Sequence, residues 1–180
     1  DDLAVLLLRA DYLYRGDPAK GEAELDRLEQ LRREDPSVLR KRLQFAARNA
    51  QAAEARGLAA EARTQRVRAI ELADRALRSA PRDTDLLLLK SGMLISDNPS
   101  LAAATARQAL DIAPGSEAAM LAYLRAVASR TPPSPVEVEE ALKVGRTFLS
   151  RSDTARAVDV RLAMADLHGV LPGSSPESRQ

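Results

Sequence analysis

The sequence predicts an all-α protein, and three observations support this fold class. Apolar residues make up 45% of the chain but aromatic residues only 3%, and the abundant alanine, leucine, arginine and glutamate favour helices over strands. Prolines follow side chains that cap helices, as in Asp17-Pro18 and Asn98-Pro99. Between these marks, apolar residues recur three and four positions apart, which is the spacing of one helix face.

Caps and stops set the expected boundaries of the helices. Side chains suited to an N-cap precede prolines at four places and occur without proline at two more; they are Asp17, Asp35, Asn98, Ser134, Ser116 and Asp153. The expected helices cover residues 2–15, 18–34, 37–56, 58–80, 84–96, 99–112, 116–130, 135–150 and 153–168. We expect the small, polar, proline-containing segment 169–180 to be a flexible tail.

The segment from residue 37 to residue 80 has two interpretations. In the first, it is an antiparallel hairpin broken at Gly57, whose two helices are long and have lengthened together to keep each other covered. In the second, one helix runs through Gly57, because glycine inside a helix costs only about 1 kcal/mol. We favour the hairpin, and the sequence leaves both interpretations open.

A short pattern of small residues recurs along the chain. Four residues return 33 positions later: Ala69, Ala73, Ala76 and Pro81 are matched by Ala102, Ala106, Ala109 and Pro114. Alanines at these intervals let a helix lie close to its neighbours, and the proline ends it. This pattern resembles the tetratricopeptide repeat, a pair of antiparallel helices of about 34 residues closed by a proline. In the first expected helix, Leu8 and Tyr12 match the leucine and tyrosine of that family.

The resemblance implies a right-handed α-α superhelix, or solenoid, of about four antiparallel hairpins plus a final helix. The expected repeats are 1–36, 37–81, 82–114 and 115–152, with a capping helix at 153–168. Such proteins generally bind peptides or partner helices along a concave face formed by the first helix of each repeat. Carried onto this sequence, that groove would be lined by Leu6, Ala10, Leu13, Leu87, Ser91, Leu94, Leu121 and Arg125. For each residue, the alternative is a place in the core between hairpins.

The charge is uneven, and the middle of the chain is basic. Residues 40–82 carry 11 basic and 4 acidic side chains, whereas residues 1–39 carry 6 and 10. A basic surface here would present Arg63, Arg68, Arg75, Arg78 and Arg82. It could contact an acidic protein, or it could be a solvated face with pairs such as Glu71 with Arg75 and Asp74 with Arg78. Aromatic residues are too scarce to stack on bases, so we expect no nucleic-acid binding.

The sequence offers little for catalysis or for a cofactor. It contains no cysteine and a single histidine, His168, so a zinc site is excluded by ligand count. Phosphate-binding loops and nucleophile elbows are absent from the sequence. The longest apolar run, 3–8, is far shorter than the roughly 20 residues of a membrane-spanning helix. We expect no enzyme activity, no cofactor, no metal and no membrane span.

These observations favour a non-catalytic scaffold that binds a peptide or an amphipathic helix of another protein, and the basic middle of the chain would suit an acidic one. Assembly of a bacterial complex is the expected setting, because the excess of alanine, arginine and leucine suggests a GC-rich source. A regulatory or sensor repeat domain of a larger signalling or transcription protein is the alternative. The chain opens on Asp1 rather than methionine, which indicates a trimmed or processed fragment. We expect a soluble protein of the cytoplasm or periplasm, and the oligomeric state stays open.

Overall fold

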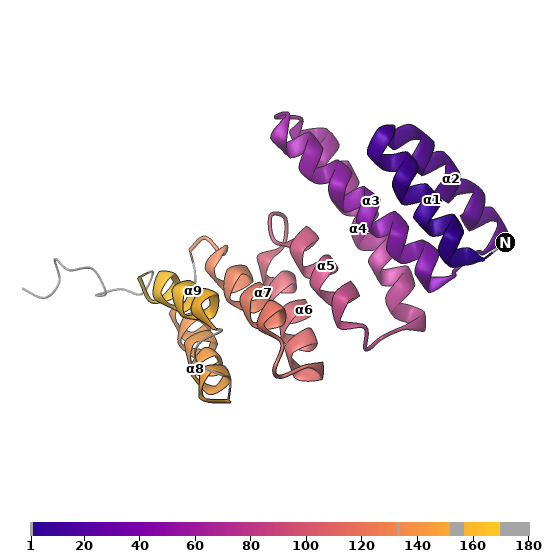
Figure 1. Cartoon of the computed structure of the whole chain (residues 1–180). Coiled ribbons are helices and arrows are strands. Elements are labelled where there is room, and N and C mark those ends of the chain that lie inside the picture. Colours follow the sequence, from indigo (N-terminus) through magenta and orange to yellow (C-terminus); the bar gives the residue numbers. More distant parts are fainter. Residues whose placement is uncertain (1, 133, 152–156, 170–180) are drawn as a thin grey trace, which may run out of the picture. The chain divides into compact units, whose positions relative to one another are not determined.

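The computed structural model describes residues 2–132, 134–151 and 157–169, which form helices and no strand (Figure 1). The all-α prediction is therefore confirmed. The chain divides into two compact units, an N-terminal unit of residues 1–89 and a C-terminal unit of residues 90–180, and the boundary falls inside α5. Over the described ranges, no helix is both long enough and apolar enough to cross a bilayer.

The N-terminal unit is a series of helices in which each packs on the next. α1 packs on α2, α2 on α3, and α3 most extensively on α4. The core joins Ala10, Leu25 and Leu28 of the first two helices to Val38 and Phe45 of the third. The bounds are α1 Leu3–Gly16, α2 Pro18–Leu31, α3 Pro36–Ala55 and α4 Ala59–Ser79, followed by α5, Thr84–Leu94.

The C-terminal unit is centred on α7. This helix packs on α6, α8 and α9, and α8 also packs on α9. Its buried residues include Met120 and Leu124, which lie on one face of α7. The bounds are α6 Pro99–Ile112, α7 Glu117–Ala128, α8 Pro135–Arg151 and α9 Val158–Gly169.

Four of the expected N-caps are confirmed by their hydrogen bonds. The side chains of Asp17 and Asp35 accept from the backbone N–H groups of Ala19 and Ser37, at 3.0 and 2.9 Å. The other two confirmed caps are Asn98, which accepts from Leu101, and Ser116, which accepts from Ala119. Asp153 lies outside the described residues. These caps explain why the helix starts were readable from sequence.

The structure contains the hairpin at Gly57, not the single long helix. α3 ends at Ala55 and α4 begins at Ala59. Gly57 has a φ of +72°, which glycine adopts without strain. Its N–H donates to Glu54 O, and the N–H of Leu58 donates to Ala53 O, both at 2.9 Å. This pair of bonds is the Schellman motif that ends a helix on a left-handed residue.

The recurring alanines lie in the packed interior of both units. All six, Ala69, Ala73, Ala76, Ala102, Ala106 and Ala109, are completely buried. In α3, Ala46, Ala50 and Ala53 are 1% exposed and belong to the pair of helices with the most extensive contact. Small side chains on facing surfaces allow two helices to approach closely, as the sequence pattern predicted.

Two helix boundaries differ from the prediction by three residues or more. α2 ends at Leu31 instead of residue 34, because Glu34 adopts a φ of +61° and its carboxylate reaches Arg75 of α4. The last helix begins at Val158 instead of residue 153. Residues 152–156 lie outside the described part of the chain, and Ala157 is buried but not helical.

Candidate functional site

The residues predicted to line a concave groove are mostly packed inside the protein. Ala10, Leu87, Ser91 and Leu94 are at most 5% exposed. The hydroxyl of Ser91 donates to Ala102 O at 2.9 Å, which is a bond between packed helices. The other candidates are half-buried or, for the last one, exposed: Leu6, Leu13, Leu121 and Arg125. The four buried side chains therefore contribute to the core between helices, which was the alternative to a place in the groove.

Helix α1 is rotated relative to the register that the family resemblance implied. Leu8 and Tyr12, which were matched to the leucine and tyrosine of that family, are 68% and 79% exposed. Tyr14 explains the rotation, because its ring stacks on Phe45 with centroids 4.0 Å apart and its hydroxyl donates to Asn49 Oδ1 at 2.6 Å. Residues two positions apart point to nearly opposite sides of a helix, so a Tyr14 that faces α3 places Tyr12 outside.

A hollow of about 490 Å³ opens between α1 and α3. We call it the α1–α3 groove. Its α1 wall is apolar and is formed by Ala4, Leu7 and Leu8. Its α3 wall is mostly polar and consists of Pro36, Ser37, Arg40, Lys41 and Gln44. The exposed side chains of Val5 and Tyr12 lie one turn from Leu8 on the same side of α1 and extend its apolar surface.

Positive charge exceeds negative charge beside this groove. The carboxylate of Asp11 has three cations around it: Arg48 at 3.0 Å, Arg15 at 3.1 Å and Lys41 at 3.7 Å. One carboxylate can neutralise one of these charges, so a surplus stays on α1 and α3. Arg40 is different, because its guanidinium pairs with Asp83 and lies 3.9 Å from Asp85.

Acidification should weaken the N-terminal unit through Asp11. Burial raises the pKa of this carboxyl, but the hydrogen bond from Arg48 and the nearby cations outweigh burial and hold the pKa below its ordinary value. A lowered folded-state pKa stabilises the fold above the unfolded pKa, and this stability is lost as the pH falls through the folded pKa. We therefore expect stability to fall below about pH 4, and Asp11→Asn to flatten that decline.

Thermal unfolding of both proteins, followed by circular dichroism across the acid range, checks this expectation. Asp159→Asn on α9 is the control, because Asp159 is exposed in the other unit. A decline as steep in Asp11→Asn as in the parent chain would contradict the assignment.

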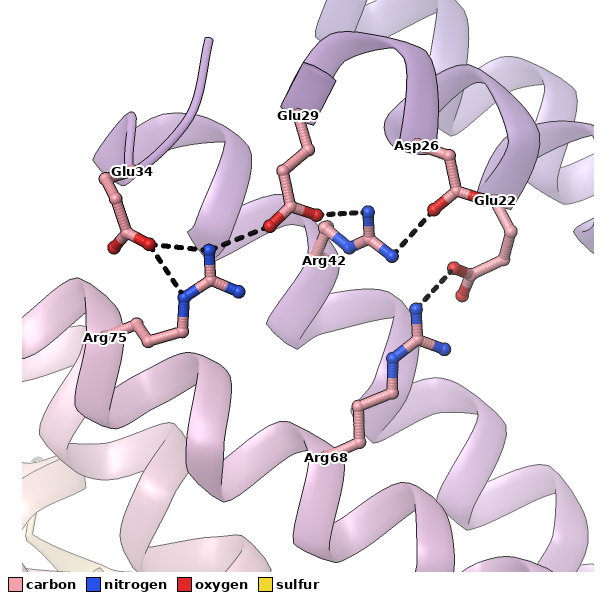
Figure 2. Close-up of polar contacts among 7 residues, drawn as sticks. All are labelled: Glu22, Asp26, Glu29, Glu34, Arg42, Arg68 and Arg75. Atoms are coloured by element: carbon pink, nitrogen blue, oxygen red, sulfur yellow. Dashed lines mark hydrogen bonds and ion pairs between the residues drawn. The ribbon is translucent and has the colours of Figure 1, made fainter.

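Two of the five arginines of the predicted basic surface pair with acidic residues of α2. Arg68 donates to Glu22 at 3.4 Å, and Arg75 donates to Glu29 at 2.8 Å (Figure 2). Arg75 also donates to Glu34, and these hydrogen bonds lower the pKa of Glu34. Arg68 and Arg75 of α4 thus face α2 and the turn after it, 41 to 46 residues away in sequence.

Three candidates of the basic surface differ from Arg68 and Arg75. Arg78 is exposed and lies 3.8 Å from Glu34. Arg63 is exposed and has an interaction within the protein, and Arg82 is exposed beyond the end of α4. The structure therefore does not gather the five arginines into one unpaired patch.

Arg42, which the sequence did not single out, is the central cation of this interface. Its side chain is 10% exposed, and it pairs with Asp26 at 2.7 Å and with Glu29 (Figure 2). Glu22, Asp26 and Glu29 lie four and three positions apart, so they form one acidic face of α2. The spacing of these acidic residues was visible in the sequence. Their partners on α3 and α4 were not, because those contacts depend on how the helices pack.

The described residues contain no group of three or more histidine, cysteine, aspartate or glutamate side chains able to hold a metal ion. His168 is exposed near the end of α9. What the α1–α3 groove offers is shape, an apolar wall and positive charge. No family model, no curated protein and no solved structure matches this chain.

Proposed function

We propose that this chain is a non-catalytic scaffold that binds a peptide or a helix of another protein, and that the α1–α3 groove is its binding site. The observation that carries the proposal is the groove itself, an apolar wall of α1 facing a polar, positively charged wall of α3. Large apolar side chains gathered on one exposed face are typical of protein-binding surfaces.

The walls of the groove define the chemistry of the partner. Leu7 and Leu8 can pack against apolar side chains, and the surplus charge around Asp11 attracts carboxylates. An amphipathic segment meets both conditions when its polar side is acidic. Such complementarity speeds association and selects between partners more than it adds affinity.

We also propose that the helical hairpins belong to a right-handed superhelical solenoid of the tetratricopeptide type. The alanine and proline pattern that recurs after 33 positions supports this, as does the sequential packing of α1 to α4. In such a solenoid the first helices of successive hairpins form the concave side, and α1 and α3 would hold these positions.

Affinity capture from a bacterial lysate tests the binding site. We expect the parent chain to capture partner proteins. A double variant, Leu8→Glu with Gln44→Glu, should capture at least about ten-fold less of the same proteins, because acidic groups in the groove repel an acidic segment. Bound proteins are quantified by mass spectrometry, and circular dichroism verifies that the variant is folded.

The matched control makes the same two changes elsewhere in the N-terminal unit. Leu31 is 67% exposed on α2 and Gln51 is exposed on α3, and neither lines the groove. Leu31→Glu with Gln51→Glu should keep the partners. Equal capture by the groove variant and the control would show that the groove is not the binding site.

A further inference from the structure

The C-terminal unit has a hollow of its own between α6 and α8, with a volume of about 480 Å³. Its apolar lining comes from both helices and from the proline after α6: Leu110, Pro114, Val144 and Phe148. We call it the α6–α8 hollow. It shares no residue with the α1–α3 groove and lies wholly within residues 90–180.

One of its three cations already has partners. Arg107 donates to Asp111 at 3.1 Å, lies 4.0 Å from Glu140, and stands over the ring of Tyr123 with 5.7 Å to the centroid. These two carboxylates are the acidic residues of the lining. The charge of Arg107 is therefore satisfied within the protein.

The other two cations, Lys143 and Arg151, form the α8 rim of the hollow. Both are exposed, and neither has an ion pair with another residue in the described part of the chain. They are eight positions apart on one helix, which corresponds to roughly 12 Å. Two cations that have no ion pair among the described residues thus flank an apolar floor at a defined separation.

From this we propose that the α6–α8 hollow is a second docking site, for a short extended segment of a partner protein with apolar residues between two acidic ones. In an extended chain, side chains four positions apart lie on the same face and are roughly 13 Å apart. This matches the rim, so carboxylates at both ends can meet Lys143 and Arg151 while the residues between them contact Val144 and Phe148. A small inorganic anion would leave the apolar floor uncovered.

The probe is the pentapeptide acetyl-Glu-Leu-Phe-Leu-Glu-amide, titrated into the isotopically labelled chain and followed by NMR shifts of backbone amides. We expect the largest shifts in 107–114 and 140–151, with a weak affinity that falls several-fold as salt rises from about 0.05 to about 0.5 M. Acetyl-Lys-Leu-Phe-Leu-Lys-amide and acetyl-Glu-Ala-Ala-Ala-Glu-amide should cause much smaller shifts. They test the charge and the apolar contact separately.

Two variants of equal charge change complete the design. Lys143→Glu with Arg151→Glu should weaken the acidic peptide at least about ten-fold. Arg125→Glu with Arg161→Glu should leave its affinity nearly unchanged, because these exposed arginines of α7 and α9 do not line the hollow. Circular dichroism checks that both variants are folded.

Several results would overturn the inference. They are an absence of shifts in 107–151 at millimolar peptide, equal binding of the lysine peptide, and equal weakening by the two variants. Shifts confined to α1 and α3 would also overturn it, while supporting the α1–α3 groove. Conversely, loss of partner capture at that groove would leave the result for the α6–α8 hollow unaffected, so the two proposals fail independently.

Discussion

Replacing Gly21 by alanine is expected to destabilise the N-terminal unit by about 2–3 kcal/mol, the upper range for an overpacked core. A Cβ at this position of α2 would lie 2.5 Å from Tyr14 Cβ, 2.7 Å from Tyr14 Cα and 2.8 Å from Tyr14 N. Backbone atoms cannot turn aside, so α1 and α2 would have to separate. That movement would disturb the stacking of Tyr14 on Phe45, and the gain of about 1 kcal/mol from alanine in a helix would not offset it.

Two other glycines provide the comparison for chemical denaturation of the variants. Gly92 lies inside α5, and a Cβ there has nothing within 4 Å. Gly92→Ala should therefore be neutral or stabilising. Gly145→Ala would meet the flexible side chain of Met164 at 2.5 Å, which can adjust its rotamer, so we expect an intermediate loss. Equal midpoints for Gly21→Ala and Gly92→Ala would refute the close approach of α1 and α2.

Replacing Arg42 by methionine is expected to cost about 2–3 kcal/mol, somewhat less than the loss for a fully buried ion pair. Methionine fills much of the volume but leaves Asp26 and Glu29 facing each other without their shared cation. Asp26 is 57% exposed and Glu29 still has Arg75, so water and Arg75 reduce the penalty. The loss should appear as a lower denaturation midpoint with an unchanged slope.

Arg15→Met is the matched control for this experiment. The Arg15 side chain is 74% exposed and pairs with Asp11 at 3.1 Å, and exposed ion pairs contribute little. Adding Asp26→Asn and Glu29→Gln to Arg42→Met should recover part of the stability, because the uncompensated charges are removed. A loss for Arg42→Met no larger than for Arg15→Met would contradict the role of Arg42.

The positions of the helices could be predicted from the sequence better than the faces that they turn toward the core. Caps such as Asp17 and Asn98 act locally, so their hydrogen bonds followed from sequence alone. The burial of the recurring alanines could be predicted as well, because small residues at helical intervals serve the close packing of helices. The register of α1 depended on Tyr14 meeting Phe45 and Asn49, which lie 31 and 35 residues further on. No local pattern contains that information.

The predicted concave groove was misplaced on α1 for the same reason. The side of α1 that faces the core differs from the one that the resemblance implied, so Leu8 lines the α1–α3 groove while Ala10, expected at a groove, is buried. Likewise, Arg75 was expected beside Glu71 on its own helix, but its partners Glu29 and Glu34 come from α2 and the turn after it. Ion pairs within one helix can be read from spacing, whereas pairs between helices require the packing.

The opposite charges that join α2 to α3 and α4 limit which of the two hairpins can be repeated along the chain. In an array of identical repeats every joint is the same, so any hairpin can follow any other. Here the first hairpin supplies carboxylates and the second supplies guanidinium groups, as with Glu22 and Arg68. A second copy of the first hairpin inserted behind it would not place Arg68 and Arg75 opposite Glu22 and Glu29. The order of the two hairpins therefore matters, because exchanging or repeating them would remove the ion pairs between them.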